Sequence, residues 1–106
     1  MANVYSTCFF DGNIVGGAEA SIFTVPSGLV YIIRDADMCA YPSGATDAYF
    51  ISTGGGNPWA VFGMSGTGSV ATWRGRQVYE AGSTFNVLST PNELQLRVSG
   101  YILTSP

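Results

Sequence analysis

The chain has 106 residues with seven acidic and four basic side chains, which gives a formal net charge of −3 at pH 7. This length fits one domain covering residues 1–106. An acidic chain with four scattered arginines lacks the basic patch of a nucleic-acid binder, so no nucleic acid is expected as a partner. The longest uncharged stretch, 48–73, is interrupted by glycines and a proline and cannot be a membrane helix. Residues 1–5 show no signal-peptide pattern, so no membrane partner is expected.

Short strands separated by glycine, proline and small polar residues account for most of the chain. Branched and aromatic residues recur at period two, and nowhere do apolar residues recur at helical spacing for two turns. The predicted strands are 3–10, 20–25, 29–41, 47–52, 59–64, 69–79, 84–89 and 94–103. This pattern predicts an all-β fold, an antiparallel two-sheet β-sandwich of about eight strands that is jelly-roll-like.

Three places in these strands predict turns or irregularities. Residues 11–13, Asp-Gly-Asn, have the composition of a tight hairpin turn. The strand 29–41 begins as an apolar run, which indicates burial on both faces, and then turns polar. A bulge near Asp35 would let this strand cross from one sheet to the other. Gly100 sits where the alternation of the last strand could slip, as at a bulge.

The stretch 71–87 predicts a strand, a tight turn and a second strand, with Gly82 free to adopt a positive φ in the turn. Arg74 and Arg76 are two residues apart and point to one face, opposite Trp73. A buried face would not tolerate two unpaired guanidinium groups. We therefore expect at least one arginine to contact another protein chain, the alternative being a surface ion pair within the chain. The candidate interface residues are Arg74, Arg76, Trp73, Trp59 and Asp35.

Two carboxylates, Asp35 and Asp37, lie at i and i+2 beside Arg34. Such a pair can share a cation or act as acid and base. The interpretation we favour is a polar strand segment in which Asp35 pairs with an arginine. Because the chain has no histidine, a Ser-His-Asp mechanism is excluded. We expect no catalytic, metal-binding or cofactor-binding residues, and therefore no enzyme.

Four aromatic residues suggest a carbohydrate platform, because aromatic faces stack on the apolar patches of sugars. They are Trp59, Trp73, Tyr79 and Tyr101. The interpretation we favour is packing in the core or in a subunit interface, where aromatic residues are enriched. The two cysteines, Cys8 and Cys39, are expected to be free, buried and reduced rather than joined in a disulfide.

Four blocks of sequence together carry a resemblance to a known family. They are residues 3–7, 25–35, 73–78 with Ala81-Gly82, and 98–103. In these blocks the chain resembles small virion structural proteins of tailed bacteriophages, of the minor tail type and similar to those of actinobacteriophages. The resemblance implies a virion component that is assembled in the host cytoplasm and contacts other virion proteins.

The function these observations favour is a non-enzymatic virion component, a minor tail protein that forms symmetric homo-oligomers. A trimer is the first expectation, by analogy with other phage jelly rolls. A capsid decoration protein is an alternative. A second alternative is a carbohydrate- or receptor-binding module that binds a host-surface glycan through Trp59 or Tyr49. The low content of charged residues, 10%, fits surfaces covered by assembly partners, and it equally fits a well-packed neutral monomer.

Overall fold

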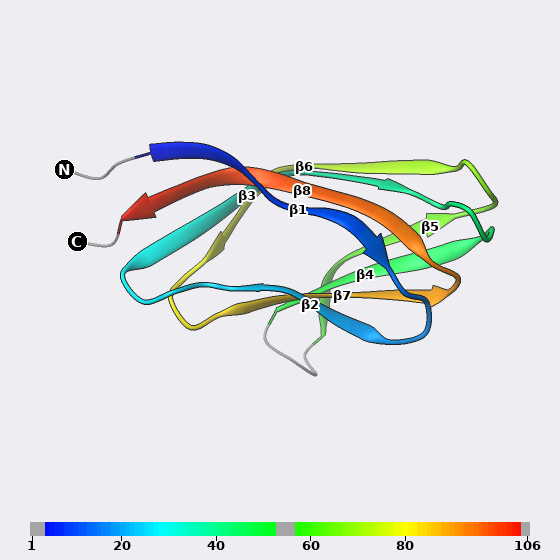
Figure 1. Ribbon diagram of the computed structural model, residues 1–106, viewed down its shortest axis with the longest axis horizontal. Coiled ribbons are helices and arrows are strands. Elements are labelled where there is room, and N and C mark those ends of the chain that lie inside the picture. The colour runs from blue at the N-terminus through cyan, green and yellow to red at the C-terminus, as the bar shows by residue number, and fades with distance from the viewer. Residues whose placement is uncertain (1–3, 53–56, 105–106) are drawn as a thin grey trace.

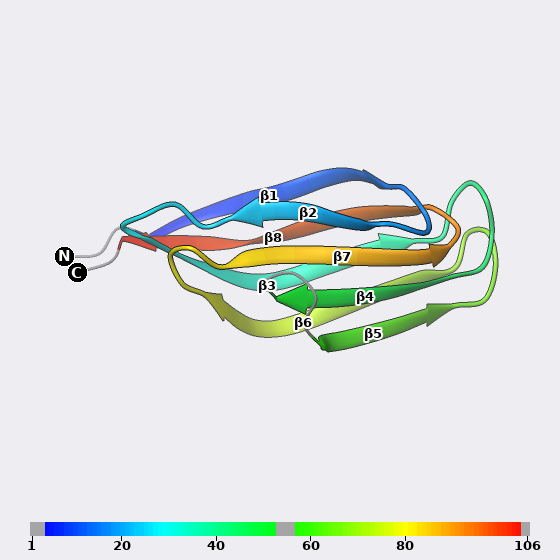
Figure 2. The same cartoon turned by 90° about the horizontal axis from the view of Figure 1, so that it is seen from below.

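Eight antiparallel strands form two four-stranded sheets that pack face to face (Figures 1 and 2). The computed structural model describes residues 4–52 and 57–104. The strands are β1 (Val4–Ile14), β2 (Glu19–Thr24), β3 (Leu29–Cys39), β4 (Thr46–Ser52), β5 (Pro58–Met64), β6 (Val70–Tyr79), β7 (Thr84–Pro91) and β8 (Leu94–Thr104). The predicted all-β sandwich is confirmed. The described residues contain no helix long and apolar enough to cross a membrane.

The strand order is that of a jelly roll. Sheet A has the order β1-β8-β3-β6, and sheet B has the order β2-β7-β4-β5. Apart from β4 and β5, strands that are neighbours in the sequence lie in different sheets, so the chain passes back and forth between the two layers. The edge strands β5 and β6 lie along one side of the sandwich, and β1 and β2 lie along the other (Figure 2).

The core lies between the sheets and is built from the inward face of each strand. On β8 the residues Leu94, Leu96 and Val98 are buried, while the alternate positions face outward, as the period-two pattern predicts. Phe50 and Phe85 of sheet B meet edge-on with ring centroids 5.2 Å apart. Apolar burial of this kind is the main source of stability for a chain of this size.

A line of register shifts crosses the middle of sheet A. In β1 the shift lies between Cys8 and Phe10, and in β3 it lies between Ile33 and Asp35. The bulge predicted near Asp35 is therefore confirmed. Gly100 of β8 lies opposite Ile33 at this level, so the extra residues belong to the strands beside Gly100 rather than to β8 itself. Bulges bend a strand and increase its twist, so sheet A bends at this line.

Two predictions about chain direction are wrong. Residues 11–13 are not a turn, because β1 runs on to Ile14 and these residues pair with Gln95, Leu96 and Arg97 of β8. Ten residue pairs along a long partner strand outweigh the local turn preference of Asp-Gly. Nor does β3 cross between the sheets, because the bulge bends the strand while both of its halves keep pairing with β8 and β6.

Cys8 and Cys39 are free, as predicted, but the expectation that both are buried is wrong. Cys8 is exposed and Cys39 is half-buried. The shift at Phe9 breaks the alternation of β1, so that Phe9 and Phe10 both pack against the core while Cys8 faces outward. A single inserted residue is enough to reverse the face on which the preceding side chains lie.

Candidate interface at the edge of the sandwich

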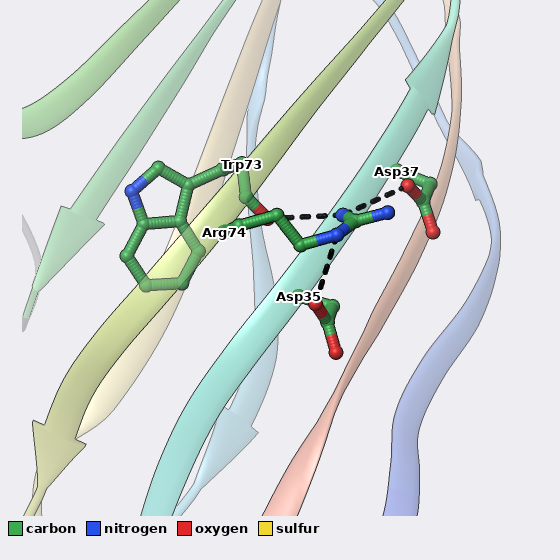
Figure 3. Close-up of polar contacts among 4 residues, drawn as sticks. All are labelled: Asp35, Asp37, Trp73 and Arg74. Carbon is green, nitrogen blue, oxygen red and sulfur yellow. Dashed lines mark hydrogen bonds and ion pairs between the residues drawn. The ribbon is translucent and has the colours of Figure 1, made fainter.

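Arg74 lies across the outer face of sheet A and binds two aspartates of the neighbouring strand (Figure 3). Its Nε atom is 3.0 Å from Oδ1 of Asp35, and its Nη1 atom is 3.1 Å from Oδ1 of Asp37. Nη1 also donates to the backbone carbonyl of Trp73, 3.2 Å away. The favoured interpretation of the two carboxylates, a polar strand segment with Asp35 paired to an arginine, is confirmed.

The register of β3 and β6 explains this arrangement. Asp35 lies opposite Arg74, and Asp37 lies opposite Thr72 on the same outer face. One guanidinium group therefore reaches both carboxylates through separate nitrogens, as its fork geometry allows. The side chain of Arg74 remains 58% exposed, so water screens the two ion pairs and their net contribution to stability is small. Arg74 thus has partners within its own chain.

Arg76 differs from Arg74 although the two side chains share a face. It is exposed, and within residues 4–52 and 57–104 no carboxylate lies within ion-pairing distance of it. Of the two arginines predicted to contact another chain, Arg76 is therefore the one whose guanidinium group is available.

Trp73 points to the side of β6 opposite to Arg74 (Figure 3). There it meets Trp59 of β5 between the two sheets. Their ring centroids are 5.2 Å apart, and the two ring planes are inclined at 71° to each other. Trp59 Nε1 donates to the hydroxyl of Tyr79, 2.7 Å away, and Ser52 Oγ is 2.8 Å from the same hydroxyl. Burial raises the pKa of Tyr79, and its hydrogen bonds to Ser52 and Trp59 oppose that rise.

This aromatic cluster closes the sandwich where β5 and β6 meet. Trp59 and Trp73 are half-buried and pack against the core, and Tyr79 is 2% exposed. Tyr101 does not join them, because it pairs with Ile32 of β3, whereas Tyr79 pairs with the adjacent Tyr31, so the two tyrosines lie on opposite faces of sheet A. The four aromatics predicted as a carbohydrate platform are thus not assembled on one surface. The contacts favour the alternative, in which the tryptophans pack in the core.

Charge is divided unequally between the sheets. All four arginines of the chain lie on strands of sheet A and are exposed, namely Arg34, Arg74, Arg76 and Arg97. Three of the seven acids, Asp11, Asp35 and Asp37, lie on the same sheet. The other four, Glu19, Asp47, Glu80 and Glu93, lie on sheet B or in turns. The strands of sheet A therefore carry charges of both signs, whereas the charged residues on the strands of sheet B are all acidic.

Sequence reasoning missed a set of exposed valines on the edge strands. Val70 and Val78 of β6 are 71% and 49% exposed, and Val61 of β5 is 55% exposed. On the other side of the sandwich, Val15 follows β1 and is 68% exposed. The alternation of β6 places Val70 and Val78 on the same face as the two arginines. This signal was readable from the sequence once that face was known to point outward.

The described residues offer little to a small ligand. One depression, of about 520 Å³, is shallow and open and is lined by Asp47, Gly63, Met64, Ser65, Ser69 and Val70. The glycine-rich residues 65–69 form the turn from β5 to β6, which leads into a strand as predicted. Among the described residues no three His, Cys, Asp or Glu side chains are grouped so as to hold a metal ion.

Comparison with known proteins identifies the fold rather than a family. No family model matches the chain, and no curated protein matches it. Among solved structures, the chain is similar to a chain from the crystal structure of the T13 IBDV viral particle, with a TM-score of 0.54 and 10% sequence identity. The match covers 98% of this chain and 31% of the viral chain, so the present sequence spans about a third of that neighbour. At this identity the likeness shows a shared fold.

Proposed function

We propose that this chain is a non-enzymatic structural component of a virion. The observation that carries the proposal is the jelly-roll strand order, matched over 98% of the chain by a chain of a viral particle. The jelly roll is an architecture that viral capsid proteins use repeatedly. The sequence resemblance to small proteins of tailed bacteriophages points to a minor tail protein within this broader class.

The arrangement of the acidic residues supports a role without catalysis. General acid–base chemistry needs a carboxyl group that is free to reach a substrate. Asp35 and Asp37 are instead both engaged by Arg74 on an open surface. Asp35 and Asp37 therefore form surface ion pairs, which is compatible with a structural protein.

We also propose that the protein forms symmetric homo-oligomers, with a trimer as the first expectation, and that it contacts other virion proteins. The exposed valines on β5 and β6 support this proposal, as does Arg76, which has no ion-pair partner among the described residues, because arginine and apolar side chains are typical of protein interfaces.

Purified particles test this function directly. Mass spectrometry of gradient-purified virions should detect the chain at a fixed stoichiometry, and electron microscopy of the same particles should place it. Density on the tail supports the minor tail assignment, and density on the capsid shell supports the decoration alternative. Absence of the chain from particles produced by cells that express it would contradict a structural role.

A further inference from the structure

The edge strands on the two sides of the sandwich carry opposite charge, although Arg74 also pairs with Asp35 and Asp37 of the inner strand β3. On the β5–β6 side, Arg74 and Arg76 lie on the outer face of the edge strand β6. On the β1–β2 side, Asp11 lies on the edge strand β1 and Glu19 begins the edge strand β2, and both are exposed. Asp11 has no cation within 4 Å among the described residues. We call these surfaces the basic edge and the acidic edge.

Apolar side chains accompany the charges on both edges. Val61, Val70 and Val78 are exposed on the basic edge, and Val15 is exposed between the two acids of the acidic edge. In the part of the chain that the structure describes, both edges also present strands whose outer backbone groups have no neighbouring strand in the sheet. Unpaired strand edges of this kind are ready to meet another chain.

The direction of the strands also matches. Each sheet contains four antiparallel strands, so its two edge strands run in opposite directions. A second copy placed beside the first by a sideways displacement therefore brings its β1 antiparallel to β6, and its β2 antiparallel to β5. The antiparallel alternation of both sheets continues across such a contact.

We propose that the basic edge of one copy binds the acidic edge of the next copy, a head-to-tail contact between opposite sides of the sandwich. This inference rests on the proposed homo-oligomeric role and names the surface that carries it. The symmetric alternatives, basic edge to basic edge or acidic edge to acidic edge, bring like charges together, which opposes association. A head-to-tail contact generates a closed ring such as a trimer when a rotation about an axis along the strands accompanies the displacement and closes, and an open row of copies when it does not.

Complementary charge reversals test the contact in solution. Arg76→Glu and Asp11→Arg should each weaken self-association at least about tenfold in light scattering after size exclusion. An equal mixture of the two variants should restore association, because Glu at position 76 then meets Arg at position 11. Arg34→Glu is the matched control, since Arg34 is an exposed cation of sheet A on an inner strand. Circular dichroism checks that each variant is folded.

Cross-linking provides a second readout that does not depend on charge reversal. One chain keeps Cys8 on β1 and carries Cys39→Ser, and the other carries Cys8→Ser, Cys39→Ser and Val78→Cys on β6, because an antiparallel contact between Asp11 and Arg76 places Cys8 beside Val78. A short bis-maleimide should give cross-linked dimers in the mixture and few in either chain alone. Self-linking of either chain alone, a monomeric wild type at millimolar concentration, or equal weakening by Arg34→Glu would overturn the proposal. Incorporation into particles is measured separately. If the chain is found in virions but its self-association is unchanged by these variants, only the edge contact is contradicted, and the proposed virion role stands.

Discussion

The hydroxyl of Tyr79 in sheet A accepts a hydrogen bond from the indole nitrogen of Trp59 in sheet B, 2.7 Å away. This bond joins the two layers at the side where β5 and β6 meet. Replacing Tyr79 by Phe keeps the ring but leaves the Trp59 donor without this acceptor. We expect Tyr79→Phe to lower the free energy of unfolding by about 1–2 kcal/mol. Chemical denaturation measures this, and Tyr49→Phe, on the outer face of sheet B, should change the free energy by less than about 0.5 kcal/mol.

The same tyrosine should make the protein sensitive to alkali. Burial raises the pKa of Tyr79 in the folded protein, whereas in the unfolded chain it titrates near its ordinary value of about 10. Above that pH the unfolded chain loses the proton first, so the unfolded state becomes relatively more stable. The stability due to the neutral phenol is complete below about pH 10 and is lost as the pH rises through the raised pKa. Denaturation curves recorded at a series of alkaline pH values give the free energy of unfolding at each pH. This free energy should decrease less with rising pH for Tyr79→Phe than for the wild type.

The fold was predictable from the sequence where a strand buries only one of its two faces, because apolar and polar residues then alternate. On β8, strict alternation of Leu94, Leu96 and Val98 with polar residues fixed both the strand and its orientation. On β1, residues 11–13 read as a turn because short-range turn preference is visible in the sequence, whereas the long pairing with β8 is not. The crossing proposed for β3 failed for a related reason, since a bulge has the same local signature whether or not the strand changes sheet.

The candidate interface was predictable only in part. The spacing of Arg74 and Arg76 correctly placed both on one outward face. It did not distinguish them, because the pairing of Arg74 with Asp35 depends on the register of two strands that are distant in the sequence. The charge division between the two edges needed the strand order, which brings β1 and β2 to one side and β5 and β6 to the other.

The close approach of β8 to the bulge in β3 predicts a sensitive position at Gly100. A Cβ atom there would overlap the carbonyl oxygen of Ile32 and lie 3.1 Å from the backbone nitrogen of Arg34. Because these are backbone atoms of a central strand, relief requires the ladder itself to shift. We expect Gly100→Ala to destabilise the protein by about 3 kcal/mol. Thermal unfolding measures this against Gly66→Ala, where a Cβ meets nothing within 4 Å; equal melting temperatures for the two variants would contradict the close packing.

The two thiols should differ in reactivity. Cys8 is exposed and its thiol is 3.3 Å from the carbonyl oxygen of Phe10, whereas Cys39 is half-buried. An aromatic disulfide reagent should therefore modify one thiol rapidly in the native protein and the second more slowly. In denaturant without reductant, two thiols should react. Mass spectrometry of Cys8→Ser assigns the fast phase, and a fast phase that survives this substitution would show that Cys8 is not the accessible thiol.

Arg74 and Arg76 should separate stability from assembly. Arg74 binds Asp35 and Asp37 within its own chain, so Arg74→Ala should lower the free energy of unfolding by about 0–1 kcal/mol, with the loss smaller at high salt. Arg76 has no such partner among the described residues, so Arg76→Ala should leave unfolding unchanged. Its guanidinium group is instead available to a neighbouring chain, so Arg76→Ala should weaken oligomerisation and particle incorporation more than Arg74→Ala does. Denaturation at low concentration and light scattering at high concentration measure the two effects on the same samples. If both substitutions leave the oligomeric state and particle incorporation unchanged, neither arginine belongs to an interface.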